Sequence, residues 1–419
     1  MHTPDTEIEK SNAQKNAFPG RLRKWFSVLG PGIITAALVF GPSKMTITSK
    51  LGAEYGYDLL WIVVVAIFFM TIFTSMAARI GAATRESLLS TIREKWGKPM
   101  SVAVGVGVFL VTASFQSGNS VGVGISLAEM THTRPLQWII IFNVLGLALL
   151  FFRTFYKMLE QVMLLLVGMM LFAFITTLVM SNPGLPDVAR GLIPSVPQGS
   201  SGLVIAFLAS TFSIVGAFYQ SYLVQERLRI RPDLPERRND SLPGILILGV
   251  MSAIVLICAA AVLHPNNGKV SNATDMAKAL EPMFGKYAAL IFLSGLFAAS
   301  FSSLIGNATV GGTLLSDALG YGRNMNSKIV RALIAVVMVI GATIAVLFGK
   351  APLELIVIAQ SITIFVVPLI GIAMYAIAND AKVMGSLKNT VMIKAFGALG
   401  LLIIISLAVV NMKELFFDK

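Results

Sequence analysis

Gly41-Pro42-Ser43-Lys44 interrupts the first long apolar stretch of this chain, which otherwise runs from about residue 26 to residue 56. A Gly-Pro pair between two helical halves removes a backbone donor and permits unusual dihedral angles, so carbonyl and amide groups are left free there. In a bilayer such groups survive only where they are buried in protein or line a wet cavity, and transporters build substrate sites from broken helices of this kind. The break therefore predicts a site that contains a lysine.

The composition excludes a soluble domain. The chain has 419 residues, of which 56% are hydrophobic and 13% charged, and its mean hydropathy is +0.79. Apolar segments of the length needed to cross about 30 Å of hydrocarbon recur along almost the whole sequence. We expect a polytopic all-α membrane protein with eleven spans, at about residues 26–56, 57–80, 100–127, 136–152, 158–180, 201–225, 243–264, 287–315, 327–348, 352–378 and 392–412.

The ends of the chain differ from the rest. Residues 1–24 are polar and lack the apolar core and cleavage site of a signal peptide, so we expect a cytosolic tail. Residues 25–412 then form a single transmembrane domain, and residues 413–419 a short C-terminal tail.

The net charge of +12 is explained by how the basic residues are distributed across the membrane topology, and it does not indicate a nucleic-acid partner. If the N-terminus is placed inside and the sides alternate, most lysines and arginines fall in cytosolic segments, including the cluster Arg227 to Arg238. The positive-inside rule then predicts a plasma-membrane protein with a cytosolic N-terminus and an external C-terminus. The single cysteine, Cys258, lies in an apolar run and is expected to pack there, so neither a disulfide nor a thiolate metal site is expected.

A second interruption lies in the sixth span. Residues 209–220, Ala-Ser-Thr-Phe-Ser-Ile-Val-Gly-Ala-Phe-Tyr-Gln, place small and polar residues at its middle. Breaks in spans one and six, five helices apart, are typical of an inverted 5+5 repeat in which two discontinuous helices hold substrate near the midplane. The alternative is an ordinary kink with a serine-rich packing face.

Several motifs, in order, resemble the Nramp divalent-metal transporters over roughly residues 25–412. They are Gly30-Pro31-Gly32, the break at 41–44, Gly52 to Trp61, Ala77 to Gly81, Lys157 to Glu160, Gly191 to Pro197, Leu223 to Arg227, and Ala298 to Ser303 through Gly312. The resemblance implies a leucine-transporter-like fold, an inverted repeat plus an eleventh helix, and secondary active transport.

The chain departs from this family at the first break. In Nramp transporters it reads Asp-Pro-Gly-Asn, and its Asp and Asn bind the metal. The matching positions here are Gly41 and Lys44, so both ligands are absent.

The other family positions are also altered. The Met-Pro-His of the sixth-helix break falls, without gaps, on Ser213, Ile214 and Val215, and a slipped register would place it at 217–219. The family's proton-route Asp and Glu of the third helix fall on Gln116 and Asn119.

Across the middle of the eleven proposed spans there is no Asp, Glu or His. Transition metals and Mg²⁺ require carboxylate, imidazole or sulfur ligands, so no metal site and no cofactor are expected. No nucleophile-base pair or phosphate loop lies at membrane depth, so an enzyme is not expected either.

Lys44 requires compensation, because a lysine at the centre of a span costs about 2.5 to 3.5 kcal/mol on insertion scales. Three roles remain open: contact with an anionic substrate group, snorkelling to the outer surface above a Lys50–Glu54 pair, or an ammonium that replaces a transported cation.

The two breaks and nearby polar residues make up the candidate site. The substrate-binding residues are expected to be Gly41, Pro42, Ser43, Lys44, Ser213, Gly216, Ala217 and Gln220. A supporting polar face is expected from Gln116, Asn119, Ser300, Ser303, Asn307 and Gln360. The structural alternatives are a small-residue packing seam at Gly118 and Gly122 and serine hydroxyls bonded within their own helix.

Three functions are compatible with this sequence. The first is an alternating-access transporter of a small polar or anionic solute. The second is a divalent cation (Mn, Fe or Mg) importer with an atypical site. The third is a transport-inactive sensor or scaffold of the same fold. The partners expected are the lipid bilayer and a small molecule or ion, whereas the solute, the coupling ion and the oligomeric state are not specified by the sequence.

Overall fold

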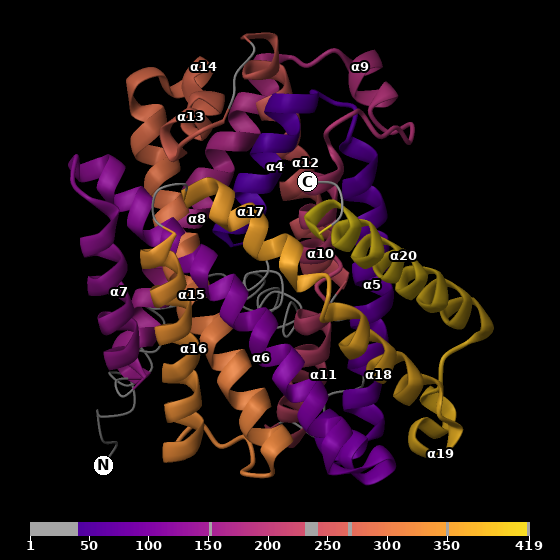
Figure 1. Ribbon diagram of the computed structural model, residues 1–419. Helices are drawn as coiled ribbons and strands as arrows, with labels where there is room; N and C mark the ends of the chain where they lie inside the picture. Colours follow the sequence, from indigo (N-terminus) through magenta and orange to yellow (C-terminus); the bar gives the residue numbers. More distant parts are fainter. Residues whose placement is uncertain (1–40, 151–152, 231–241, 267–269, 349–351, 417–419) are drawn as a thin grey trace, which may run out of the picture.

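The computed structural model describes residues 41–150, 153–230, 242–266, 270–348 and 352–416, and the regular elements within these ranges are helices (Figure 1). The expected N-terminal tail and the first half of the first span lie outside the described residues. The longer helices that occupy expected spans are α5 (Leu60–Ala83), α6 (Leu88–Thr131), α7 (Pro135–Leu149), α8 (Arg153–Ser181), α12 (Leu242–Val262), α15 (Ala288–Leu319), α16 (Lys328–Leu347) and α20 (Val391–Phe416).

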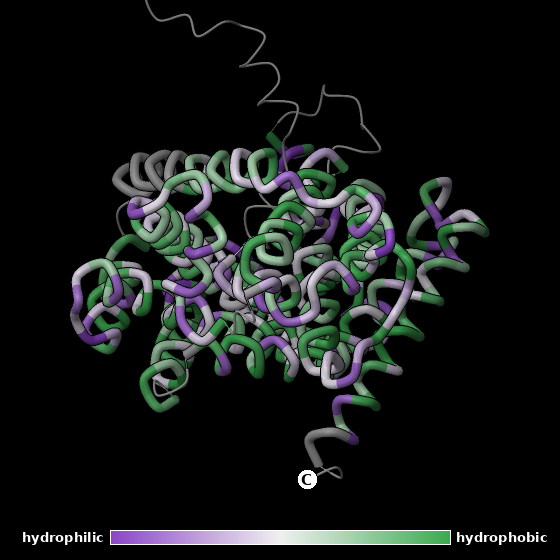
Figure 2. Tube along the Cα trace, turned by 90° about the horizontal axis from the view of Figure 1, so that it is seen from above, coloured by the Kyte–Doolittle hydropathy of each residue, from purple (hydrophilic) through white to green (hydrophobic). Residues whose placement is uncertain are grey.

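Seven helical segments of the described chain are long and apolar enough to cross a membrane, or eight if one bent pair is counted as a span. With the bent pair counted, these segments, α7, α8 and α4 (Pro42–Tyr55), which covers the second half of the first span, lie at the positions of the eleven expected spans. In Figure 2 the helices at the periphery carry long stretches of hydrophobic residues. The apolar window of α20 is only 22% buried, so this helix presents most of its surface outward, as a lipid-facing helix does.

The sixth span is broken, as the sequence predicts. It consists of α10 (Ser201–Thr211) and α11 (Ile214–Ile230). Ser213 between them has φ +46°, a left-handed backbone conformation that residues other than glycine rarely adopt. Its apolar window is 89% buried, against 33% for α16, so the broken helix lies at the centre of the molecule. At the first break, α4 begins at Pro42 with Gly41 as its N-cap.

A break in the tenth span was not predicted. The segment is divided into α17 (Pro352–Thr363) and α18 (Val367–Asn379), which are bent by 41°. Pro368 in the first turn of α18 explains the bend, because proline has no N–H to donate to a carbonyl four residues earlier.

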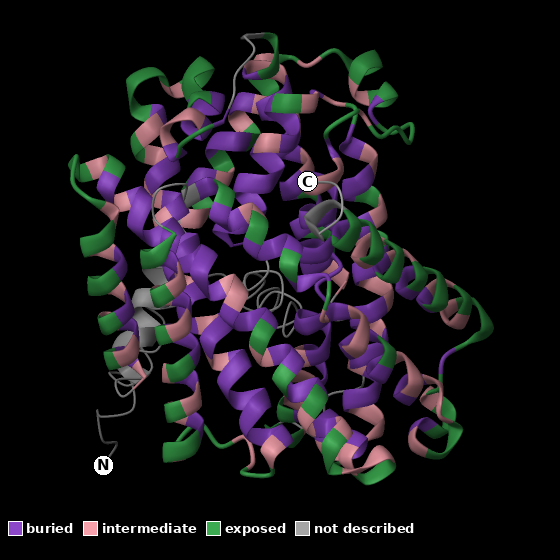
Figure 3. Ribbon diagram, in the orientation of Figure 1, coloured by how far each residue is buried: buried purple, intermediate pink, exposed green. Residues whose placement is uncertain are grey.

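Glycines allow the central helices to approach closely. A Cβ on Gly311 of α15 would lie 2.1 Å from Thr112 Oγ1 of α6, and a Cβ on Gly81 of α5 would lie 2.4 Å from the carbonyl oxygen of Ser221 on α11. These helices form the mostly buried interior in Figure 3. The interior therefore consists of closely packed helices, with the two breaks among them.

The remaining short elements connect the spans. They are α9 (Leu185–Arg190), η1 (His264–Asn266), α13 (Ala273–Ala277), η2 (Lys278–Leu280), α14 (Glu281–Phe284), η3 (Gly285–Tyr287), α19 (Ala381–Met384) and η4 (Gly385–Leu387).

Candidate functional site

A small cavity of about 50 Å³ lies where the two breaks meet α6, α15 and α17. Eight of the residues predicted from the sequence line it: Gly41, Ser43, Lys44, Asn119, Ser213, Gly216, Asn307 and Gln360. Four lining residues were not predicted: Phe115, Ser210, Val215 and Val310. Ser210 and Val215 lie within the quoted break of the sixth span, and Phe115 and Val310 lie on the helices that supply Asn119 and Asn307, so their positions on these elements could have indicated them.

Lys44 lies at the centre of this arrangement and does not snorkel. It is 1% exposed, and its Nζ donates a hydrogen bond to Thr211 Oγ1. The same Nζ lies 5.1 Å from the centre of the Phe207 ring, within the range of a cation–π interaction. Lys50, by contrast, is only partly buried. Its Nζ lies 3.9 Å from Glu54 Oε1, so the predicted Lys50–Glu54 pair is present.

An ammonium group has three N–H donors. Among the described residues, Thr211 is the one hydrogen-bond acceptor of Lys44 Nζ. Since Lys44 also lines the cavity, its remaining donor capacity is available to whatever occupies that space.

Two helix N-termini face the same cavity. Gly41 and Ser43 bring the start of α4 to it, and Ser213 and Gly216 bring the start of α11. The first N–H groups of a helix have no partner within the helix, and the helix dipole adds about half a positive charge there. The two N-termini and the lysine together make the cavity suitable for an anionic group.

Amides complete the polar lining, and one of them, Asn307, also holds two helices together with Gln116, which does not line the cavity. Asn307 Nδ2 donates to the carbonyl oxygen of Thr112 at 2.6 Å, and Gln116 Nε2 donates to the carbonyl oxygen of Leu304 at 2.9 Å. Both bonds join α6 to α15, so this part of the supporting face is a clasp between helices, and Asn307, but not Gln116, also lines the cavity.

Gln360 on α17 is different. It is 2% exposed, and its Oε1 has no hydrogen-bond partner among the described residues. A buried acceptor without a partner costs free energy, so an N–H or O–H group of a ligand or of water would stabilise it.

The other predicted residues lie beside the cavity, not on its wall. Pro42 packs on Gly122, where a Cβ would be 2.7 Å from the ring, so the predicted packing seam receives the start of α4. Ala217 and Gln220 are buried within α11 but do not line the cavity. Ser300 Oγ donates to the carbonyl oxygen of Leu296 in its own helix, as the structural alternative predicts.

Ser303 lies next to the first break. Its Oγ has no partner among the described residues and would be 3.1 Å from a Cβ on Gly41. Ser303 therefore lies against Gly41, which lines the cavity.

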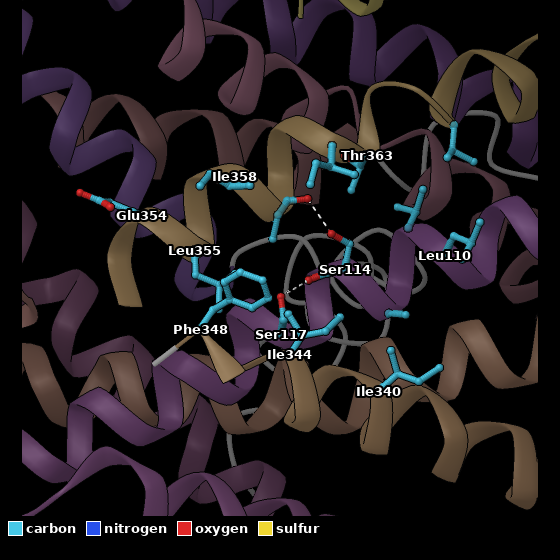
Figure 4. Close-up of a pocket in the computed structure, with 15 residues that line it drawn as sticks. Leu110, Ser114, Ser117, Ile340, Ile344, Phe348, Glu354, Leu355, Ile358 and Thr363 are labelled. Atoms are coloured by element: carbon cyan, nitrogen blue, oxygen red, sulfur yellow. Dashed lines mark hydrogen bonds between the residues drawn. The ribbon is translucent and has the colours of Figure 1, made fainter. Parts of the chain in front are cut away.

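A second and larger cavity, of about 600 Å³, lies between α6, α16 and α17 (Figure 4). Its walls are mostly aliphatic, with Leu110, Ile340 and Ile358 among them. Its two serine hydroxyls are already bonded, Ser114 to the carbonyl oxygen of Ala359 and Ser117 to that of Ser114, each at 2.7 Å. This space suits hydrocarbon, so the small polar cavity is the better candidate for a polar solute.

Within the described ranges, no group of three or more His, Cys, Asp or Glu side chains could hold a metal ion. The lining residues of the small cavity supply hydroxyl and amide oxygens but no carboxylate, imidazole or thioether. Cys258 is buried and free, and its Sγ lies 3.3 Å from the carbonyl oxygen of Phe174, in keeping with the packing role expected for it.

Solved structures with the same arrangement of helices are transporters. The manganese transporter of Eremococcus coleocola, in complex with an aromatic bis-isothiourea substituted compound, superposes with a TM-score of 0.76 over 94% of this chain and 89% of its own, at 20% identity. MhsT in complex with L-phenylalanine gives a TM-score of 0.59 at 14% identity, covering 90% of this chain and 98% of its own. The nucleobase-cation-symport-1 family transporter Mhp1 gives 0.52. These likenesses show the leucine-transporter-like fold.

Curated relatives are similar along nearly the whole chain. The divalent metal cation transporter MntH of Deinococcus radiodurans is 25% identical over 94% of this chain and 91% of its own length. MntH of Latilactobacillus sakei is 27% identical over 91% of this chain and 87% of its own. The family Nramp, natural resistance-associated macrophage protein-like, matches residues 32–413. The chain therefore belongs to the Nramp family of membrane transporters.

Proposed function

We propose that this protein is a secondary active transporter that works by alternating access and carries a small anionic or polar solute, not a transition metal. The convergence of the Lys44 ammonium with the N-termini of α4 and α11 on one polar cavity supports this function most directly. Positive helix ends and a lysine are the groups that bind carboxylates and other anions. The unpartnered Gln360 Oε1 adds an acceptor for an N–H or O–H group of the same solute.

A divalent metal is disfavoured by the same groups. At an effective dielectric constant near 20, a doubly charged ion about 4 Å from one ammonium would be repelled by roughly 8 kcal/mol. Neutral hydroxyl and amide oxygens do not offset that repulsion together with the loss of the ion's hydration shell. Manganese coordination in this cavity would require the Lys44 side chain to leave Thr211.

The second candidate function is divalent cation transport, and the names of the relatives favour it, because MntH proteins are called divalent metal cation transporters. In that case the ion would bind away from Lys44, and Lys44 would have a structural role alone.

For the orientation, we infer a plasma-membrane protein with its N-terminus in the cytosol and its C-terminus outside. The distribution of basic residues supports this assignment. The end of the molecule at which α6 begins and α11 and α15 end is then cytosolic.

Uptake into proteoliposomes tests the function. The purified protein is offered a labelled panel of small carboxylates, zwitterionic amino acids and neutral polar solutes, with labelled Mn²⁺ and Mg²⁺ in parallel. We expect uptake of at least one organic solute and background uptake of both metals.

Two matched variants connect that uptake to the site. Lys44→Met removes the ammonium and keeps most of the length of the side chain, whereas Lys50→Met makes the same change at a partly exposed position on the same helix. We expect Lys44→Met to abolish solute uptake and Lys50→Met to retain it. Mn²⁺ uptake that survives Lys44→Met, without uptake of any organic solute, would support the second candidate instead. Absence of all uptake by folded protein would support the scaffold.

A further inference from the structure

The C-terminal end of α10 has the features of a cation site. Its last residue is Thr211, whose side chain is fully buried and whose hydroxyl oxygen is an acceptor. One turn earlier, the equally buried ring of Phe207 presents its face. The last carbonyls of a helix have no partners within the helix, and the dipole adds about half a negative charge at that end. Hydroxyl, ring face and helix end all attract positive charge.

The occupant of this end is part of the chain itself. The Lys44 side chain comes from α4, 167 residues earlier in the sequence, and its Nζ contacts both Thr211 Oγ1 and the Phe207 ring. In the described part of the chain, no carboxylate forms an ion pair with this ammonium. The compensation that a buried charge requires therefore comes from the end of α10.

We propose that the end of α10, with Thr211 and Phe207, is a binding site for a monovalent ammonium-type cation, which this protein fills with its own Lys44 side chain. A ring face together with a single hydroxyl suits a cation that donates N–H bonds and is easily dehydrated, and cation–π contacts are a common means of recognising ammonium groups. The tethered ammonium makes the site unavailable to a diffusible cation, so transport does not depend on Na⁺ or K⁺ at this position. This inference holds for whichever solute the neighbouring cavity takes.

The lengths of the side chains give a direct test. Lys44→Ala keeps Cβ and removes Cγ, Cδ, Cε and Nζ, and propylammonium has three carbons and one nitrogen to replace them. The thermal unfolding temperature of the purified protein in detergent is measured with and without propylammonium chloride. We expect Lys44→Ala to unfold below the wild type and to regain several degrees with propylammonium, because a ligand that binds the folded state raises its stability.

Matched controls separate binding at the emptied site from a general effect of the salt. Lys44→Met fills most of the emptied space without a charge, and Lys50→Ala makes the same change outside the site, so neither should gain from propylammonium. Propanol, which has the same length without a charge, should not stabilise Lys44→Ala. Adding Thr211→Val to Lys44→Ala should remove most of the gain.

The site can also be tested without emptying it. In the otherwise unchanged protein, Thr211→Val and Phe207→Leu should each lower the unfolding temperature, and the decrease caused by Thr211→Val should be largely absent from the Lys44→Met background. An equal decrease in both backgrounds would overturn the proposal, as would equal stabilisation of Lys44→Ala by propanol and propylammonium. These measurements do not involve transport, so their failure is distinguishable from a failure of the proposed function.

Discussion

The hydroxyl of Tyr222 on α11 donates a 2.7 Å hydrogen bond to Oδ2 of Asp317, a buried carboxylate near the end of α15. Arg93 at the start of α6 donates to the carbonyl oxygens of Asp317 and Ala318 at 2.6 and 2.7 Å. Arg323 lies 5.6 Å from the centre of the Tyr222 ring and donates to Gln225 at 2.8 Å. The broken helix is thus fastened to α6 and α15 at the end of the molecule inferred to be cytosolic.

This fastening predicts that Tyr222→Phe opens that end. A hydrogen bond to a charged group contributes about 1.5 to 3 kcal/mol, so its loss should shift the balance toward states in which the cavity is reachable from this side. The measurement is the labelling rate of Val215→Cys, a cavity position, by a membrane-impermeant maleimide in a Cys258→Ala background. We expect faster labelling from the cytosolic side.

Tyr219→Phe is the matched control. Its ring stacks on Tyr222 at 6.4 Å, but the bond to Asp317 comes from Tyr222. If both variants change the labelling rate equally, the hydrogen bond does not hold this end closed. Asp317→Asn should behave like Tyr222→Phe if it does.

The amide clasp between α6 and α15 predicts a loss of stability that is not additive. Gln116→Leu and Asn307→Leu each remove one hydrogen bond to a carbonyl within the facing helix, and a bond of this kind contributes about 0.5 to 1.5 kcal/mol. Because both amides lie in one network, with Asn307 Nδ2 3.5 Å from Gln116 Oε1, the double variant should lose less than the two losses combined. Unfolding temperatures of the two single variants and the double variant provide this test. Additive losses would show that the two amides act separately.

The seam that receives the start of α4 predicts that Gly122 does not tolerate a methyl group. An added Cβ would lie 2.3 Å from Ser300 Oγ and 2.7 Å from Pro42 Cβ, and overpacking of this kind costs about 1 to 3 kcal/mol. Gly122→Ala should therefore lower the unfolding temperature and displace the first break, which would also reduce solute uptake. Gly168→Ala is the control, since nothing lies within 4 Å of its added Cβ. Equal stability of the two variants would contradict this packing.

Much of the fold is predictable from the sequence because periodicity and apolar length determine a membrane helix locally. The break in the sixth span is an example. Ser213 and its small neighbours interrupt an apolar run, and the structure places the left-handed residue at Ser213, the position given by the gap-free alignment. Pro368 is a comparable local signal in the tenth span. It lies within a continuous apolar run, however, so the sequence predicted one unbroken helix there.

The surroundings of Lys44 were not predictable in the same way. Its partners, Thr211 and Phe207, belong to a helix far along the chain, and neither is an acid. The sequence therefore offers no acidic partner for Lys44, because a helix end compensates its charge. Only the tertiary structure shows which helix end this is. Gln220 illustrates the converse, since this polar residue of the predicted break is buried in α11 and does not line the cavity.

The first break finally predicts a gain of metal binding when its two altered positions are changed together. Lys44→Asn removes the repelling ammonium, and Gly41→Asp adds the carboxylate that Mn²⁺ prefers as a ligand. A Cβ at Gly41 would lie 3.1 Å from Ser303 Oγ and 3.5 Å from Asn119 Oδ1, so the added Cβ requires only a small movement of the serine hydroxyl. Titration calorimetry should show Mn²⁺ binding at least about tenfold tighter in the double variant than in either single variant, because one change leaves the repulsion and the other leaves the ligand missing. If Lys44→Asn alone binds Mn²⁺ as well as the double variant, repulsion by the ammonium is the main obstacle to metal binding. If the double variant binds none, the cavity also lacks the further ligands that manganese needs, and Ser213→Met would be the next change to add.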